Sequence, residues 1–160
     1  MSMATAVQPE IKMIGISART TNAQEAGPEG LIPGLWKTLY SSSIAAHPGI
    51  ANPEFTYVLY TDYESDATGA YTVVIGHEIS NDAFQGEKQE DHFIIPAGKY
   101  VVFKTKKGPV FEVIPQAWRD IWAYFENSVE KRAYTGDFER YDTRGFDPSS
   151  AEVEIYIAVK

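Results

Sequence analysis

The stretch "GPVFEVIPQAW" at residues 108–118 matches an earlier stretch of the same chain, "GPEGLIPGLW" at residues 27–36. Each stretch has a Gly-Pro pair, then an Ile-Pro pair, and then a tryptophan three residues after the second proline. Shared residues in the same order are hard to attribute to chance. They indicate an internal duplication, and two copies are too few for a solenoid.

Both tryptophans lie in segments with the spacing of an amphipathic helix. In "LIPGLWKTLYSS" (31–42) and "PVFEVIPQAWRDIWAYFENS" (109–128), apolar residues recur at intervals of three and four. This spacing places them on one side of a helix that packs on a core. Each half is therefore predicted to contain one long helix.

Runs rich in β-branched and aromatic residues flank each predicted helix and indicate strands. The first half has them at 10–19, 55–63 and 70–79, and the second half at 91–108, 134–142 and 151–160. The polar stretch 80–91 is predicted to connect the halves. The order strand, helix, strand, strand thus occurs twice, at 11–79 and 92–160.

The predicted fold class is α+β, in a single domain of residues 1–160. Two β-α-β-β units bury their apolar faces when they form one antiparallel sheet with both helices on one face. A cleft between the helices would then lie at the centre of the molecule, where small-molecule sites often occur.

Composition excludes several classes of function. The net charge of −8 argues against a nucleic-acid surface, which needs clustered basic residues. The absence of cysteine excludes disulfides, thiolate nucleophiles and zinc-thiolate sites. His47, His77 and His92 are too scattered for a metal site, and no Gly-rich phosphate loop suggests a cofactor. Without a long apolar run, we expect a soluble cytoplasmic protein that does not contact a membrane.

The strand "TGDFERYD" (135–142) contains the most informative carboxylate. Alternation along a strand places Glu139 and Tyr141 on one face and Phe138 and Arg140 on the other. From the residues alone, Glu139 is an ordinary surface acid, a buried anion that awaits a cationic ligand, or a catalytic base.

The aromatic residues allow two interpretations as well. Trp36 and Trp118 either fill the core under the helices or line the cleft, and Trp122 lies one turn beyond Trp118. Tyr156 alternates with a row of valine and isoleucine, so either Tyr156 or that row faces the helices.

These residues together resemble the GyrI-like small-molecule-binding domain. The resemblance rests on Gly108-Pro109 before the helix, the strand "FIIPAGKYVVFK" (93–104), "FERYD" (138–142) and the terminal "EVEIYIAVK" (152–160). This domain is also the effector-binding half of multidrug-responsive bacterial regulators of the AraC and MerR types. Those regulators have a DNA-binding domain before it, whereas this chain resembles the stand-alone members, integron-borne drug-binding proteins included.

The resemblance implies a site for hydrophobic, often cationic, aromatic molecules. The family's buried glutamate lies in a Phe-Glu-x-Tyr strand, which here is Phe138 to Tyr141. With Glu139, the predicted ligand-binding residues are Tyr141, Trp36, Trp118, Trp122, Tyr60, Tyr63, Tyr71 and Tyr156.

The leading hypothesis is a binding protein for amphipathic cationic aromatic molecules that performs no chemistry and does not bind DNA itself. One alternative is a hydrolase of reactive small molecules, in which Glu139 is the general base and a neighbouring tyrosine the acid. Another is a protein inhibitor of a topoisomerase, which would act through an exposed surface and would not need a closed pocket.

Overall fold

The computed structural model describes residues 2–66, 68–86 and 92–160. The strands are β1 (Ser2–Gln8), β2 (Ile11–Thr20), β3 (Phe55–Thr61), β4 (Tyr71–Glu78), β5 (His92–Ile95), β6 (Gly98–Lys104), β7 (Asp137–Asp142) and β8 (Glu154–Ala158). The helices are α1 (Asn22–Glu25), α2 (Ile32–Ser41), α3 (Asn81–Gly86) and α4 (Val110–Asn127), and a 3₁₀ turn spans Ile44–Ala46. In these ranges no helix is long and apolar enough to cross a membrane.

The strands form one curled antiparallel sheet in the order β1-β6-β8-β7-β3-β4-β2-β5. Strands β3 and β7 pair at its centre. Outward from this pair, β4 and then β2 follow on one side, while β8 and then β6 follow on the other. The strand-helix-strand-strand units therefore occupy equivalent places, and the predicted α+β fold is confirmed. That the two units arose by duplication stays a prediction.

Each half also has a leading strand that pairs with the other half. Strand β1 pairs with β6 and begins with Ser2 opposite Lys104, whereas β5 pairs with β2 and ends with Ile95 opposite Ile11. Strand β1 was not predicted. The stretch predicted as a single strand at 91–108 is two strands, because Pro96 and Ala97 interrupt the pairing. The counterpart of β2 is therefore β6, which begins at Gly98, and β5 is the counterpart of β1.

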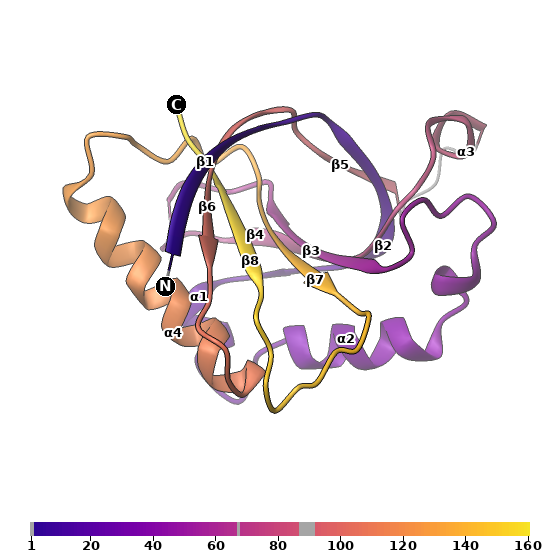
Figure 1. Cartoon of the computed structure of the whole chain (residues 1–160), viewed down its shortest axis with the longest axis horizontal. Coiled ribbons are helices and arrows are strands. Elements are labelled where there is room, and N and C mark those ends of the chain that lie inside the picture. Colours follow the sequence, from indigo (N-terminus) through magenta and orange to yellow (C-terminus); the bar gives the residue numbers. More distant parts are fainter. Residues whose placement is uncertain (1, 67, 87–91) are drawn as a thin grey trace.

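The two faces of the sheet have separate cores. Helices α2 and α4 cover one face, below the sheet in Figure 1, and the β1–β2 connection and β5 curve over the other. On the helix-covered face, Leu39 of α2 packs on β3 and β4, and Ile121 of α4 packs on β6 and β8. On the opposite face, Phe138 and Tyr156 stack with ring centroids 4.4 Å apart. Glu139 belongs to the helix-covered face.

The two matching Ile-Pro pairs lie at different positions within the two long helices. Pro33 lies in the first turn of α2, where no intrahelical bond needs its missing N–H. Pro115 lies inside α4, which begins at Val110 and so has an extra turn before the proline. This extra turn carries Phe111, whose side chain is 74% exposed.

Candidate functional site

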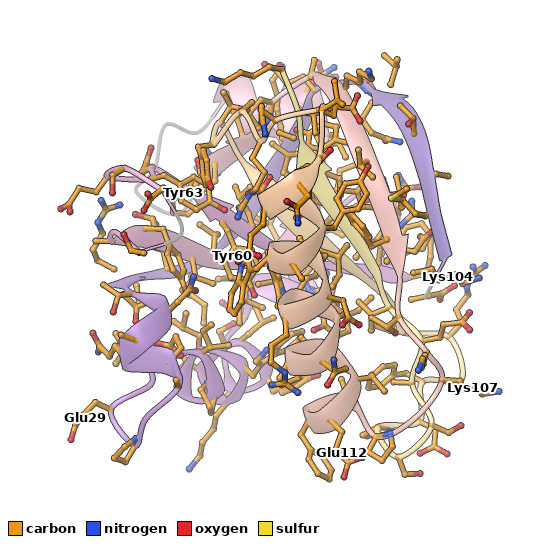
Figure 2. The ribbon with its side chains drawn as sticks, turned by 90° about the vertical axis from the view of Figure 1, so that its left-hand side faces the viewer. Glu29, Tyr60, Tyr63, Lys104, Lys107 and Glu112 are labelled. Atoms are coloured by element: carbon orange, nitrogen blue, oxygen red, sulfur yellow. The ribbon has the colours of Figure 1, made fainter. Side chains whose placement is uncertain are left out.

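A cavity of about 850 Å³ lies on the helix-covered face. Its walls come from α1, α2 and α4, and its floor comes from β3, β4 and β7. In Figure 2, Tyr60 and Tyr63 lie beside α4, on the side that faces the α1–α2 segment. The volume falls in the range of about 300–1,000 Å³ that is usual for small-molecule sites.

Glu139 lies at the floor of this cavity and is only 2% exposed. The strand register places Val58 of β3 opposite it on one side and Ile155 of β8 on the other. The two residues directly opposite Glu139 therefore supply only hydrocarbon, and a charged carboxylate at this position has to find its partners elsewhere along the strands and on the helices.

Three neutral groups donate hydrogen bonds to Glu139. Oε2 accepts from the Tyr60 hydroxyl and from Nε1 of Trp118, both at 2.7 Å. Oε1 accepts from the Tyr141 hydroxyl at 2.6 Å. In residues 2–66, 68–86 and 92–160, no Lys or Arg forms an ion pair with Glu139. The carboxylate is held in place, but its charge is not neutralised by a cation.

Burial sets the protonation behaviour of this group. Burial raises the pKa of Glu139, and the hydrogen bonds from Tyr141, Trp118 and Tyr60 pull it back only in part. Burial, together with the nearby Glu139 charge, raises the pKa of Tyr60 and of Tyr141 well above the ordinary value. Both hydroxyls therefore keep their protons and act as donors across the ordinary pH range.

Aromatic rings surround the carboxylate and contact one another by their edges. The Tyr60 ring lies 5.2 Å from Trp118 and 5.6 Å from Tyr71, between centroids. Trp36 of α2 contacts Tyr141 at 5.1 Å. These rings leave π-faces and hydrocarbon around a single buried oxyanion, a combination that suits a cation with aromatic groups.

A second buried acid, which the sequence did not predict, is bonded to two residues that line the cavity. Asp137 is fully buried, and its Oδ1 accepts from the backbone N–H of Ala158 at 2.8 Å. Its Oδ2 accepts from the Tyr63 hydroxyl at 2.5 Å and from Nη2 of Arg132 at 2.7 Å. Unlike Glu139, this carboxylate has a cationic partner, and that partner, Arg132, also lines the cavity.

A third carboxylate fixes the cavity wall where α2 begins. Glu25 accepts hydrogen bonds from the backbone N–H groups of Leu31 and Ile32, at 2.8 and 3.0 Å. These N–H groups at the start of α2 have no acceptor within the helix, and the helix dipole also favours a negative charge there. Burial, followed by the charges of Glu25 and Glu139, raises the pKa of Tyr71. Glu25 thus positions α2 and adds negative charge to the cavity.

The model of the GyrI-like small-molecule-binding domain matches residues 6–160. The chain belongs to the GyrI-like family. The family is described as a small-molecule-binding domain, which agrees with a cavity of this volume.

Two GyrI-like relatives share about a third of their residues with this chain. The first is YobU of Bacillus subtilis, whose name suggests a role in transcriptional regulation; it is 34% identical over 93% of this chain and 92% of its own length. The second is the integron cassette protein VCH_CASS2 from the mobile metagenome of Vibrio cholerae. Its crystal structure is 34% identical and has a TM-score of 0.75, over 99% of this chain and 95% of that one.

A more distant structure has the same fold. SAV2435, solved bound to tetraphenylphosphonium, is 19% identical with a TM-score of 0.76, over 100% of this chain and 94% of that one. At this identity the likeness shows the GyrI-like fold alone.

The structure brings eight of the nine predicted residues to the cavity of this GyrI-like chain. Those that line it are Glu139, Tyr141, Trp36, Trp118, Trp122, Tyr60, Tyr63 and Tyr71. Their contact with a ligand stays a prediction. The placement of Tyr156 in the pocket is wrong: its ring packs on Phe138 and Tyr100 on the other face, because Ile155 and Ile157 face α4.

Other residues of the cavity had no clear sequence signal. Glu25 and Arg132 lie in connections between the predicted elements, and Arg119 lies on α4 outside its apolar stripe. Among the residues that the structure describes, no three His, Asp or Glu side chains come together as a metal site would require.

Proposed function

We propose that this protein binds amphipathic aromatic cations in the cavity and that Glu139 recognises their positive charge. One observation supports this most directly. Glu139 is 2% exposed, receives hydrogen bonds only from neutral donors, and lies at the floor of a cavity walled by aromatic rings.

Physical chemistry favours a cation as the occupant. A buried carboxylate without a cationic partner is costly, which the raised pKa of Glu139 reflects. A bound cation removes part of this cost by pairing with the charge. The rings of Tyr60, Trp118 and Trp36 add cation–π contacts, each contributing about 0.5–2 kcal/mol. A neutral ligand gains only the contact with the rings.

The same geometry is less suited to catalysis. A general base needs a free lone pair aimed at a substrate proton, and three of the about four acceptor sites of the Glu139 carboxylate are already occupied by hydrogen bonds, which leaves one on Oε1. We therefore propose binding without turnover, and the net charge of −8 favours a small cation over nucleic acid as the partner.

The test uses phenyl-substituted probes of similar size and different charge with the Glu139→Gln variant. Tetraphenylphosphonium is the cation, triphenylphosphine oxide the neutral probe and tetraphenylborate the anion. Binding is followed by quenching of the tryptophan fluorescence. Glutamine keeps the size and an acceptor oxygen but loses the charge, so affinity for the cation should fall about tenfold to a hundredfold. Affinity for the neutral probe should stay the same or rise.

Glu152→Gln is the matched control, because it removes a carboxylate that pairs with Lys104 on the surface, away from the cavity. It should leave all three affinities unchanged. An equal loss of cationic and neutral probes in Glu139→Gln would mean that Glu139 only maintains the shape of the cavity. Turnover of an activated ester by the wild type, lost in Glu139→Gln, would replace binding with the hydrolase alternative.

A further inference from the structure

Arg132 uses only part of its capacity to donate hydrogen bonds. A guanidinium has five N–H groups on three nitrogens. Nη2 donates to Asp137 and, at 3.5 Å, approaches the Tyr63 hydroxyl. Nε is buried without a partner. Among the described residues Nη1 also has no partner, but unlike Nε it is not sealed from solvent, and Arg132 lines the cavity.

The orientation of this guanidinium is fixed by its surroundings. Arg132 is 7% exposed, so the charge is buried almost as deeply as that of Glu139. Its guanidinium carbon lies 4.4 Å from the centre of the Tyr134 ring. Tyr134 has a left-handed backbone, with φ of 54°, which is unusual for a bulky residue. If Arg132 served only as the ion-pair partner of Asp137, none of its other N–H groups would need to remain available at the cavity.

The carboxylate that pairs with Arg132 lies at a defined backbone spacing from Glu139. Asp137 and Glu139 share a face of β7 and are two residues apart. At about 3.3 Å per residue, their backbones are therefore separated by about 6.6 Å. The guanidinium of Arg132 is bonded to the first carboxylate, and the unpaired charge of Glu139 is the second. The cavity thus offers a positive and a negative group a few ångströms apart.

We propose that Arg132 is a second ligand-binding subsite and that the cavity takes amphoteric aromatic molecules. Such a ligand has a cationic group for Glu139 and a carboxylate or other strong acceptor for Arg132, about 6–8 Å away along β7. The proposal rests on the proposed function for the cationic end. It adds that a plain lipophilic cation occupies only part of the site.

Two dyes with the same aromatic cation test this. The free acid of a diamino-rhodamine is a zwitterion at neutral pH, and its methyl ester has the same ring system without the carboxylate. With wild-type protein the acid should bind at least as tightly as the ester, although Glu139 repels its carboxylate. A preference of the wild type for the ester by tenfold or more would overturn the proposal.

Arg132→Lys keeps the positive charge beside Asp137, so the fold is maintained, but it loses the forked donors. The ratio of acid to ester affinity should shift by about tenfold toward the ester, which is the loss expected for a charge-assisted hydrogen bond. Arg144→Lys makes the same change in an exposed pair with Asp142, outside the cavity lining, and should leave the ratio unchanged. An unchanged ratio in Arg132→Lys, or a shift in Arg144→Lys alone, contradicts the assignment.

This result is separable from that of Glu139→Gln. If Glu139 does not recognise charge, both dyes keep their affinity in Glu139→Gln, while the effect of Arg132→Lys on the ratio persists. If only the Arg132 subsite is wrong, Glu139→Gln still weakens the binding of both dyes, and Arg132→Lys leaves the ratio of acid to ester affinity unchanged.

Discussion

The two halves of the sheet meet at Val58 and Glu139, which lie directly opposite each other on the central strands. Two residues after each of them is a tyrosine, Tyr60 in one half and Tyr141 in the other, and both hydroxyls donate to Glu139. The scaffold is symmetric here, but the charge is not. One half supplies the acid, and both halves supply the donors that hold it.

The equivalent tryptophans diverge in the same way. Trp118 donates a hydrogen bond to Glu139, whereas Trp36 contacts the edge of Tyr141. Both line the cavity, which decides between the core and the cleft, the two locations that the sequence left open. Equivalent positions in the two halves therefore share packing and differ in polar chemistry, and three experiments test this.

The largest effect is expected from Val58→Glu, which makes the centre symmetric in charge. Two carboxylates would face each other in a buried place without a cation. The free energy of unfolding should fall by about 3–5 kcal/mol, as for an uncompensated buried charge. Val58→Gln has nearly the same size without the charge and is the control, with both measured by urea unfolding at neutral pH. Equal losses of unfolding free energy in the two variants would show that side-chain volume, and not charge, causes the destabilisation at position 58.

An intermediate effect is expected from replacing the two tryptophans by phenylalanine. Trp118→Phe removes a hydrogen bond to a buried charged group and should lower the free energy of unfolding by about 1.5–3 kcal/mol. Trp36→Phe keeps an aromatic ring against Tyr141 and should cost about 1 kcal/mol or less. Urea unfolding of both variants measures the difference. The comparison fails if Trp36→Phe costs as much as Trp118→Phe.

The smallest effect concerns pH. Because the folded-state pKa of Glu139 is raised, the folded protein holds this proton more tightly than the unfolded chain. The contribution of Glu139 to stability is fully present below its pKa in the unfolded chain and is lost as the pH rises through its pKa in the folded protein. Within this window the slope is at most about 1.4 kcal/mol per pH unit.

The difference in unfolding free energy between wild type and Glu139→Gln, followed from pH 4 upward, isolates this contribution from other acids. Asp142 is one such acid, because hydrogen bonds from Arg144 lower its pKa to about 2. A difference that is flat with pH, or that grows in favour of the wild type, would mean that Glu139 is not perturbed as described.

Local patterns predicted most of the scaffold. The spacing of Leu35 and Leu39 predicted α2, and that of Ala117 and Ile121 predicted α4. Alternation along β7 placed Glu139 and Tyr141 on one common face, and the structure shows that the helices cover it. Strand β1 was missed because its sequence, SMATAVQ, has little alternation of apolar and polar residues. It is a strand because β6, nearly a hundred residues away, supplies its hydrogen bonds.

The site was predictable as a set of aromatic residues around Glu139, but its polar contacts were not. The bond from Tyr60 joins residues 79 positions apart, and the bond from Tyr63 to Asp137 joins residues 74 apart. No local pattern encodes such pairs. Arg132 lies in a connection without periodicity, and its burial follows only from the packing around Asp137. The assignment of Tyr156 failed because two faces of β8 were both apolar.

The exchange of leading strands makes the chain a single unit of folding. Since β1 completes the second half and β5 completes the first, neither half has its full set of backbone partners until both are present. A cut between residues 80 and 92 would yield two fragments that each lack an edge strand. Pairs as distant as Ser2 and Lys104 must close a long loop before they gain a bond, which slows folding relative to a helical domain of this size. At high concentration a second molecule can supply the same strand, so refolding is the step at which intertwined dimers would arise.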